Sequence, residues 1–574
     1  MTRPPDLRHH RQPTAPSGAD DRWETQGSEQ IAMDYAHRMF ERQHVMLPPL
    51  GFQVDWADQP SRHKLYLDTV KVPLPEPFRS LPSVRLDEAV RSARCAGATE
   101  APELDVLATM LGCYGLTGRR TTPNWNPDSD AKIQAARALW ARPTASGGGM
   151  YPAESYLVIG RSGPLPAGVY HYDTAHHSLD RLSVGDQCDA IAAATGVRAD
   201  LYAVSTLRFW KNTFKYHSFG YHVVTQDAGA LLASWRLVLA AHHRPVEPVL
   251  WFDESVVGAV LDVDGCDEAP FVVVPLGHTT KSPAPATPGP GARIGWNTRH
   301  GVWEQSRRVQ SFEMVSRVHA AALVGGRPRP GPGTAQAGTA FTPLRGDVLT
   351  LPEPGPGPAD LDLGESLRGR RSSFGLFTAR PPLDVRDVGW VLSSVARAGL
   401  AGTDVAPGPR GHPWTRQWVL ASSVAGLEQR VYGYDAARHS LVAGPALEVS
   451  RLQALYALDN YSMPEVAAII VVTGRLDALV AAYGARGYRM LSIEAGSAVQ
   501  TAYLAATARG LGVGAVLGLD NIRIDELLGI AGTGERSMNF MLLGHERTPR
   551  LHYDHDLYRD RRGETGAARE GTVQ

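Results

Sequence analysis

An arginine-rich segment in the second half of the chain has residue types suited to binding a phosphate. It reads Arg368-Gly-Arg370-Arg371-Ser372-Ser373. A guanidinium group matches the oxygens of a phosphate with parallel hydrogen bonds, and a serine hydroxyl adds a further donor. The same composition also occurs at exposed basic helix ends. The candidate phosphate ligands are therefore Arg370, Arg371 and Ser372.

A glycine run in the first half could approach a flat or anionic ligand closely. It reads Ser146-Gly147-Gly148-Gly149. Glycines lack a Cβ atom, so their backbone N–H groups can come near such a ligand, although a plain turn has the same composition. The matching stretch of the second half, 407–413 (PGPRGHP), has prolines there. Because proline has no N–H group, that stretch offers fewer donors.

A third candidate is Leu517-Gly518, which follows glycines at positions 510, 512 and 514. As a dinucleotide signature this pattern is poor, because it follows a helical stretch and not a strand. A helix cap followed by a turn is the alternative interpretation. The first half has Trp251 where the second half has Gly518. A tryptophan at this position would fill space that a ligand could otherwise occupy.

These segments belong to a duplicated sequence. The stretch 216–229 recurs as 483–496 with matching Tyr, Gly-Tyr and Ala-Gly positions, and VYHYD at 169–173 recurs as VYGYD at 431–435. Repeats of this length predict two tandem domains of one fold. A covalently joined pair can build the interface of a symmetric dimer while its halves diverge.

The elements that position these residues are interspersed helices and strands. Helical spacing, ending at a glycine, is expected over 104–113 and 388–398, and long apolar helices over 228–241 and 495–508. Strands are expected at 155–159, 270–276, 417–421 and 538–543. The pattern predicts an α+β fold in which each domain has a mixed sheet and a large central helix.

Proline- and glycine-rich segments set the expected domain boundaries. We predict a disordered N-terminus (1–29), a first domain (30–280), a linker with a possible helix at 301–323 (281–360), a second domain (361–550) and a tail (551–574).

Composition excludes several classes of function. The 574 residues include 58 basic and 59 acidic ones, giving a net charge of −1, so we expect neither nucleic acid nor a membrane surface as a partner. No apolar run is long enough to cross a membrane, and the N-terminus lacks a signal peptide. The four cysteines show no C-x-x-C spacing, so we expect no metal site. A cytoplasmic protein is the resulting prediction.

In combination, these motifs resemble the FMN-dependent nitroreductase superfamily. Residues 142–179 resemble its SagB-type azoline dehydrogenases, and the N-terminal Trp56-Ala-Asp-Gln-Pro60 is similar to that branch. The resemblance implies two tandem nitroreductase-fold domains that form an intramolecular pseudo-dimer, with FMN at their interface. Arg547 and Arg550 are the candidates for its phosphate contacts after the last strand.

The resemblance also implies one composite flavin site shared by the two halves. The second half would supply Arg370, Arg371, Ser372, Leu517 and Gly518, and the first half Ser146, Gly147 and Gly148. The opposite site would combine Arg91 and Ser92 with the 407–413 stretch and Trp251. Because that combination is poorer in donors, we expect one FMN per chain.

The SagB-type branch uses a Lys-Tyr pair as its catalytic motif, and Lys215-Tyr216 matches it. The second half has Ala482-Tyr483 at these positions. Without the resemblance, a surface lysine beside a core tyrosine would be the default interpretation. With it, Lys215 would accept a proton from the substrate, provided that its surroundings lower its pKa, and Tyr216 could relay that proton.

The predicted function is FMN-dependent oxidation of thiazoline or oxazoline rings to thiazoles or oxazoles in a ribosomally made precursor peptide. Molecular oxygen is the expected electron acceptor, and a cyclodehydratase that makes the azolines is the expected partner. Two alternatives stay open. One is an NAD(P)H-dependent flavin reductase, nitroreductase or dehydroamino-acid reductase on the same fold. The other is a non-enzymatic subunit that recruits a peptide.

Overall fold

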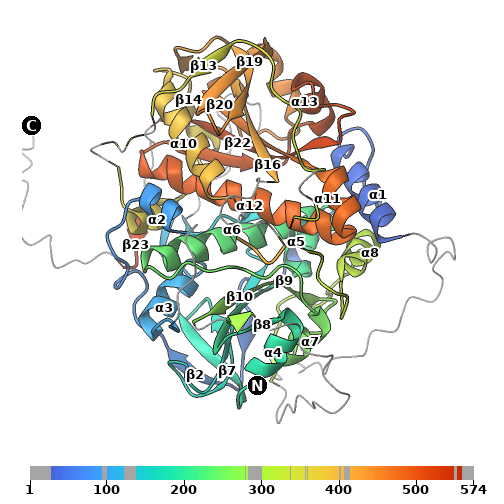
Figure 1. Cartoon of the computed structure of the whole chain (residues 1–574), viewed down its shortest axis with the longest axis vertical. Helices are drawn as coiled ribbons and strands as arrows, with labels where there is room; N and C mark the ends of the chain where they lie inside the picture. The colour runs from blue at the N-terminus through green and yellow to red at the C-terminus, as the bar shows by residue number, and fades with distance from the viewer. Residues whose placement is uncertain are drawn as a thin grey trace, which may run out of the picture.

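The computed structural model shows two halves stacked along the long axis of the molecule, with two long helices between them (Figure 1). It describes residues 27–93, 100–121, 138–277, 280–281, 300–331, 333–335, 338–353, 355, 357, 360–399, 402–405, 414–547 and 553–558. Within these ranges, no helix combines the length and hydrophobicity that crossing a membrane requires.

The two long helices, α6 (Gly220–Ala241) and α12 (Ala485–Ala508), pack against each other at the centre. Every residue of α6 is buried, and nearly every residue of α12. A helix that is apolar and small-residue-rich on most of its sides is suited to such a fully enclosed position. Both helices begin earlier than predicted, because the buried stretch also includes polar residues that a hydrophobicity pattern does not reveal.

Two glycines allow the central helices to touch backbone to backbone. A Cβ atom on Gly229 would collide with the carbonyl oxygen of Ile493, and one on Gly496 would collide with that of Gln226. The two positions correspond in the duplicated sequence, so the contact follows the pseudo-symmetry of the two halves.

Replacing Gly229 by alanine should therefore lower the free energy of unfolding by about 3 kcal/mol, because the helices would have to separate. Thermal and urea unfolding followed by circular dichroism would measure this loss. Gly331, with open space around its Cβ position, provides the matched Gly331→Ala control. Equal stability of the two variants would contradict the close contact.

The first half contains a six-stranded sheet in the order β10-β9-β5-β6-β7-β2. Its strands are β2 (Val70–Pro73), β5 (Ala153–Ile159), β6 (Gly168–Asp173), β7 (Ser178–Val184), β9 (Leu201–Arg208) and β10 (Glu268–Leu276). The accompanying helices are α2 (Leu86–Ser92), α3 (Leu104–Gly112), α4 (Cys188–Thr195), α5 (Phe209–Tyr216) and α7 (Glu254–Leu261).

The second half repeats this topology in an eight-stranded sheet, with β22-β20-β16-β18-β19 in the place of β10-β9-β5-β6-β7. Its strands are β13 (Val348–Thr350), β14 (Phe377–Thr378), β16 (Thr415–Ala421), β18 (Arg430–Asp435), β19 (Ser440–Ala446), β20 (Ala468–Arg475) and β22 (Glu535–Glu546), and β21 (Gly512–Val516) pairs with β22. Its helices are α9 (Leu363–Gly369), α10 (Val385–Arg397), α11 (Leu476–Tyr483) and α13 (Asn521–Leu527). The predicted α+β fold with two similar halves is confirmed.

The prediction of mixed sheets was wrong for the described strands. All pairs in the two large sheets are antiparallel. Direct loops without a crossover helix join β5 to β6 and β6 to β7, and such connections produce antiparallel neighbours. The short pair β15 (Leu383–Asp384) and β17 (Val424–Ala425) is parallel.

Segments from each half cross to the other. Helix α1 (Ser28–Phe40) packs on α11 and α12 of the second half and on α8 (Glu313–Ala322), which lies within the predicted linker. The C-terminal strand β23 (Asp554–Asp556) pairs with β3 (Gly118–Thr121), which pairs with β4 (Ala138–Ala141). Two further short pairs are β1 (Leu65–Tyr66) with β12 (Val302–Trp303) and β8 (Val197–Arg198) with β11 (Thr280–Lys281). The contacts of α1 with α11 and α12 and the pairing of β23 with β3 join the two halves.

Candidate functional site

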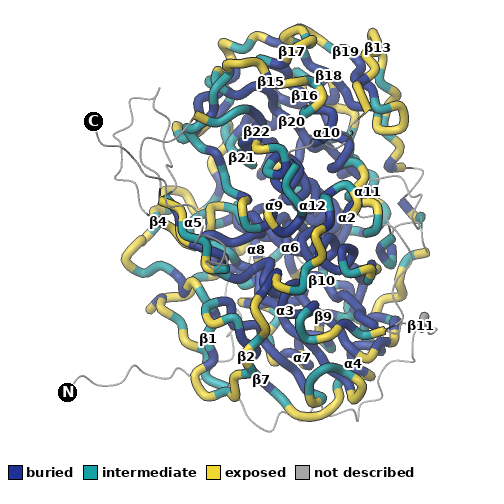
Figure 2. The backbone as a smooth tube through the Cα atoms, turned by 90° about the vertical axis from the view of Figure 1, so that its left-hand side faces the viewer, coloured by how far each residue is buried: buried dark blue, intermediate teal, exposed yellow. Residues whose placement is uncertain are grey.

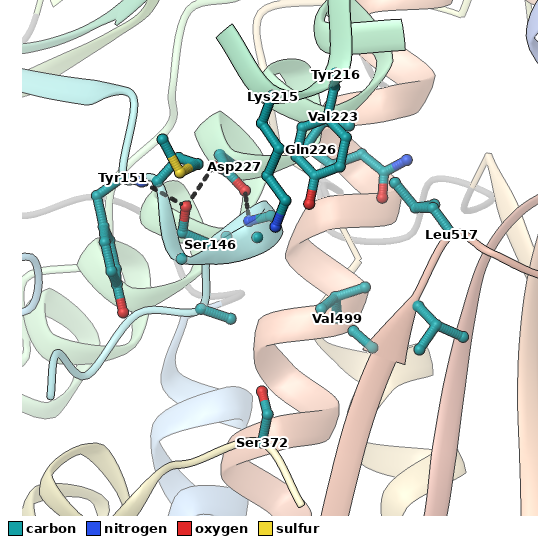
Figure 3. Close-up of a pocket in the computed structure, with 18 of the residues that line it drawn as sticks. Ser146, Tyr151, Lys215, Tyr216, Val223, Gln226, Asp227, Ser372, Val499 and Leu517 are labelled. Carbon is teal, nitrogen blue, oxygen red and sulfur yellow. Dashed lines mark hydrogen bonds between the residues drawn. The ribbon is translucent and has the colours of Figure 1, made fainter. Parts of the chain in front are cut away.

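A cavity of about 860 Å³ lies between the two halves. Residues of both halves line it, including the ten predicted site residues: Ser146, Gly147, Gly148, Lys215, Tyr216, Arg370, Arg371, Ser372, Leu517 and Gly518. Figure 3 shows Lys215 and Tyr216 pointing from the first half toward the space that Val499 and Leu517 of the second half face. The fold thus brings segments from distant parts of the sequence to one place.

The predicted phosphate ligands lie where α9 ends. Arg370 is buried, with 7% of its surface exposed, and donates a 3.0 Å hydrogen bond to the carbonyl oxygen of Arg142. Arg371 forms an ion pair with Glu546. The hydroxyl of Ser372 lies 2.8 Å from that of Tyr503. Within the described residues, no carboxylate forms an ion pair with Arg370, so its buried charge is available to an anionic ligand.

Two further arginines, neither of them a predicted site residue, lie at the same end of the cavity. Arg142 is 4% exposed, and its guanidinium stacks 4.3 Å from the centre of the Tyr151 ring. In the described part of the chain no acidic partner neutralises it. Arg120 donates to the carbonyl oxygen of Arg368 at 2.8 Å, and its buried Nε, which makes no hydrogen bond, lies 3.8 Å from the Asp554 carboxylate. Burial, together with the charges of Arg370 and Arg371, lowers the pKa of Arg120.

The glycine loop uses part of its hydrogen-bonding capacity internally. The Ser146 hydroxyl donates to Asp227 at 2.7 Å, and the Gly147 N–H donates to the same carboxylate at 2.8 Å (Figure 3). Two of the predicted donors, the Ser146 hydroxyl and the Gly147 N–H, therefore already donate to Asp227, a residue that was not among the predicted site residues. Gly148 has a left-handed backbone with φ of 65°, a conformation that favours glycine.

Burial raises the pKa of Asp227 to about 7, against the two hydrogen bonds that lower it. Since this pKa lies above the ordinary value of 3.8, the folded state binds the proton more tightly than the unfolded state does. The contribution of protonated Asp227 to stability is fully present below about pH 4 and is lost as the pH rises through about 7.

Replacing Asp227 by asparagine should remove this contribution, so the thermal midpoint of the variant should fall less than that of the wild type between pH 4 and 7. The shift in pKa corresponds to a free-energy change on the order of 4 kcal/mol. Thermal unfolding across this pH range measures the difference. Glu494, whose pKa burial also raises to about 7, titrates in both proteins and serves as the internal reference. Parallel pH profiles would contradict the assignment.

Lys215 and Tyr216 end helix α5 directly above the glycine loop. The Lys215 Nζ lies 5.1 Å from the centre of the Tyr216 ring. A Cβ atom on Gly148 would lie 3.0 Å from this Nζ and would collide with the Tyr216 hydroxyl. The absence of a side chain at Gly148 therefore makes room for both catalytic candidates.

Helix α5 is tied to the loop one turn before Lys215. Buried Lys211 donates to the Glu154 carboxylate at 2.9 Å and to the carbonyl oxygen of Tyr151 at 3.1 Å. The Asn212 side chain donates to the carbonyl oxygen of Gly147 at 3.2 Å. These bonds fix where the Lys215 side chain emerges into the cavity.

The Leu517-Gly518 segment is held from both sides. Arg42, which follows α1, donates to the carbonyl oxygen of Leu517, and Gln43 donates to that of Gly518 at 2.7 Å. The Ala457 N–H donates to the carbonyl oxygen of Gly518 at 2.9 Å. A Cβ atom on Gly518 would lie 2.9 Å from the Tyr456 ring. Glycine is therefore needed at this wall of the cavity.

In the first half, the segment equivalent to Leu517-Gly518 contains Trp251, and neighbouring residues of the protein pack against it. The buried Asp404 carboxylate accepts hydrogen bonds from the N–H groups of Leu250 at 2.7 Å and Trp251 at 3.1 Å. The Trp251 indole donates to the carbonyl oxygen of Arg327, and Arg329 lies 3.1 Å from Asp404. Burial raises the pKa of Asp404. The buried Trp251 indole is thus held against the segment after α8, and its predicted filling of a ligand site stays a prediction.

Other predicted residues stand apart from the cavity. Arg91 pairs with Asp87 at 2.7 Å on the surface of α2. Arg547 pairs with Glu465 at 3.0 Å and does not line the cavity described above. The 407–413 stretch and Arg550 lie outside the described residues.

Comparisons with known proteins find similarity to nitroreductases. The model of the nitroreductase family matches residues 412–545. The chain is 33% identical over 113 residues to a protein of Methanocaldococcus jannaschii named as a nitroreductase, which covers 20% of this chain and 57% of that protein. It is 30% identical over 129 residues to the trifolitoxin-processing protein TfxB of Rhizobium leguminosarum bv. trifolii, covering 21% of this chain and 35% of TfxB. The chain therefore spans less than two thirds of the length of both curated relatives.

A solved structure shares the fold over nearly the whole chain. It is the crystal structure of an Anabaena variabilis protein named as a nitroreductase, with a TM-score of 0.65 and 21% sequence identity, covering 90% of this chain and 99% of that one. The two-domain arrangement is thus shared with another protein. The match to TfxB supports the expected SagB-type branch.

Proposed function

Because the chain is a nitroreductase-superfamily protein, we propose that it is an FMN-dependent dehydrogenase that oxidises thiazoline or oxazoline rings in a precursor peptide. The observation that carries the proposal is the composition of the cavity between the halves. It combines unpaired buried arginines from one end, a glycine-built wall, and a Lys-Tyr pair that only the first half contains.

The residues of the cavity fit FMN. Arg370 and Arg142 are buried cations without an acidic partner among the described residues, which suits a phosphate. Gly148 and Gly518 line the cavity without side chains, so their backbone can approach a flat ring while Tyr216 and Tyr456 pack closely beside them. When bound, FMN accepts a hydride from the substrate and passes the electrons on, with molecular oxygen as the proposed acceptor.

The side chains of this protein would handle the proton that the ring loses. Converting an azoline to an azole removes one carbon-bound hydrogen as a hydride and a second as a proton. The Lys215 amine would accept this proton, and the neighbouring Tyr216 hydroxyl would relay it. Lys211 and Asn212 hold α5 against the glycine loop, and this anchoring would orient the amine toward the substrate ring.

The proposed substrate is a peptide. The name of the relative TfxB says that it processes trifolitoxin, which is consistent with a peptide-modifying role for the present chain. The proposed partners are the azoline-containing precursor peptide and the cyclodehydratase that forms its rings.

The visible spectrum of the purified protein tests the proposal first. We expect a flavin absorbance and about one FMN per chain, because Asp404 and Trp251 close the opposite site. Anaerobic mixing with a synthetic thiazoline peptide should then bleach the flavin and yield the thiazole. Two flavins per fully loaded chain would contradict the single site. Steady-state oxidation of NADPH without a peptide would favour the reductase alternative.

A further inference from the structure

A β-hairpin is inserted next to the glycine loop in the first half only. Between Gly115 and Pro152 the first half contains strands β3 and β4, whereas the matching stretch of the second half, from Gly399 to Pro413, is much shorter. The second half keeps the sheet and the central helix without this insertion, so the shared fold does not require it. The hairpin occurs only in the half that contains the Lys-Tyr pair, so we expect it to contribute to the reaction.

One edge of the hairpin pairs with another strand, and its other edge pairs with no strand among the described residues. Strand β23 of the C-terminus pairs with β3, and β4 is the last strand of this three-stranded sheet. In the described ranges, no strand pairs with the outer edge of β4, which lies at the left margin of the view in Figure 2. A strand edge with unpaired N–H and C=O groups is a template for another extended backbone.

The exposed side chains of β4 are apolar and reach the cavity. Leu139 is 43% exposed and Trp140 is 42% exposed, and both line the cavity. Two more exposed apolar residues, Trp56 and Leu458, line it as well. Large apolar side chains left in contact with water around a cavity mouth mark a binding surface.

We infer that β4 binds an extended segment of the substrate peptide by strand addition, with Leu139 and Trp140 contacting its apolar side chains. The backbone groups of β4 would pair with those of the peptide, and every second peptide side chain would face the same side. The surface is continuous with the cavity, so a peptide held there can place a ring farther along its chain beside Lys215.

The charged residues of the cavity indicate which net charge the bound peptide should have. Seven cationic side chains line it: Arg42, Arg62, Arg120, Arg142, Lys215, Arg370 and Arg371. Asp227 is the one carboxylate residue among its described lining residues. Arg370 and Arg142 are the proposed phosphate ligands and Arg371 is paired with Glu546, but the remaining cations still disfavour a basic peptide. A neutral or acidic peptide with apolar residues beside the ring is therefore preferred. The inference depends on the proposed function only for the identity of the ring.

Binding can be measured apart from the reaction. The probe is a fluorescein-labelled synthetic peptide with one central thiazoline and leucines on both sides, titrated with FMN-loaded protein by fluorescence anisotropy. Two further peptides carry backbone N-methyl groups, one at the odd and one at the even positions beside the ring. Neighbouring N–H groups of a strand point to opposite edges, so one methylated set should weaken binding about tenfold and the other should bind like the parent.

Variants of the protein provide a second test of peptide binding at β4. Trp140→Ala and Leu139→Ala should each weaken binding of the parent peptide about tenfold. The matched control is Trp303→Ala, since Trp303 is 37% exposed but does not line the cavity. Equal loss for both methylated peptides, or equal affinity of the Trp140→Ala and Trp303→Ala proteins, would overturn strand addition at β4. Peptide binding without any bleaching of the flavin would instead overturn the proposed function.

Discussion

Replacing Lys215 by alanine is expected to slow bleaching of the flavin by a thiazoline peptide by about a hundredfold to ten-thousandfold. The Lys215 amine lies over Gly148 and beside Tyr216, and it lines the cavity in which the ring would be oxidised. Without it, no amine at that position can take the proton. The flavin should stay bound, because its candidate phosphate ligands lie on another element.

Anaerobic single-turnover mixing measures this effect, with the visible spectrum before mixing as the check on flavin content. Lys215→Arg separates two roles of the side chain, since arginine keeps the positive charge but does not release its own proton at neutral pH. We expect Lys215→Arg to be as slow as Lys215→Ala. A rate close to that of the wild type in the arginine variant would assign the side chain an electrostatic role only.

The duplicated fold supplies a matched control. Ala482 occupies in the second half the position of Lys215 in the first. The double variant Lys215→Ala/Ala482→Lys restores the lysine at the closed pseudo-site, where Asp404 engages Leu250 and Trp251. We expect it to stay as slow as Lys215→Ala. Recovered turnover would show that the opposite site works and would contradict a single flavin per chain.

Sequence comparison of the two halves predicted much of this architecture, because duplication makes differences between equivalent positions visible. The α+β fold follows from the order of the elements, and Trp251 opposite Gly518 indicated which pseudo-site would be closed. The predicted site residues line one cavity. Their roles as ligands and catalytic groups stay predictions.

The parts that the sequence did not predict depend on contacts between distant segments. Arg42 reaches the carbonyl oxygen of Leu517, and β23 pairs with β3, although hundreds of residues separate the partners along the chain. A single arginine or a short polar strand carries no local pattern that reveals such a partner. Asp227 and Asp404 were missed for the same reason, since an isolated aspartate shows neither its burial nor its hydrogen bonds before the chain is folded.

The second large effect concerns the phosphate end of the cavity. Replacing Arg370 by alanine should raise the Kd for FMN about a hundredfold, because a buried hydrogen bond to a charged group contributes about 3 kcal/mol. Arg370 is buried, and its charge has no acidic partner in the described part of the chain. Fluorescence titration of FMN into the protein after flavin removal would measure the change.

Arg368 provides the control two residues earlier, on helix α9, and does not itself line the cavity. Arg368→Ala removes the same charge from the same segment, so any long-range electrostatic effect is shared by both variants. We expect Arg368→Ala to bind FMN like the wild type, and inorganic phosphate to compete with FMN in the wild type but only weakly in Arg370→Ala. The thermal midpoint of each flavin-free protein separates loss of the ligand from loss of the fold. If Arg370→Ala kept the affinity of the wild type while folding normally, the phosphate would have to bind elsewhere, with Arg120 and Arg142 as the remaining cationic candidates in the same cavity.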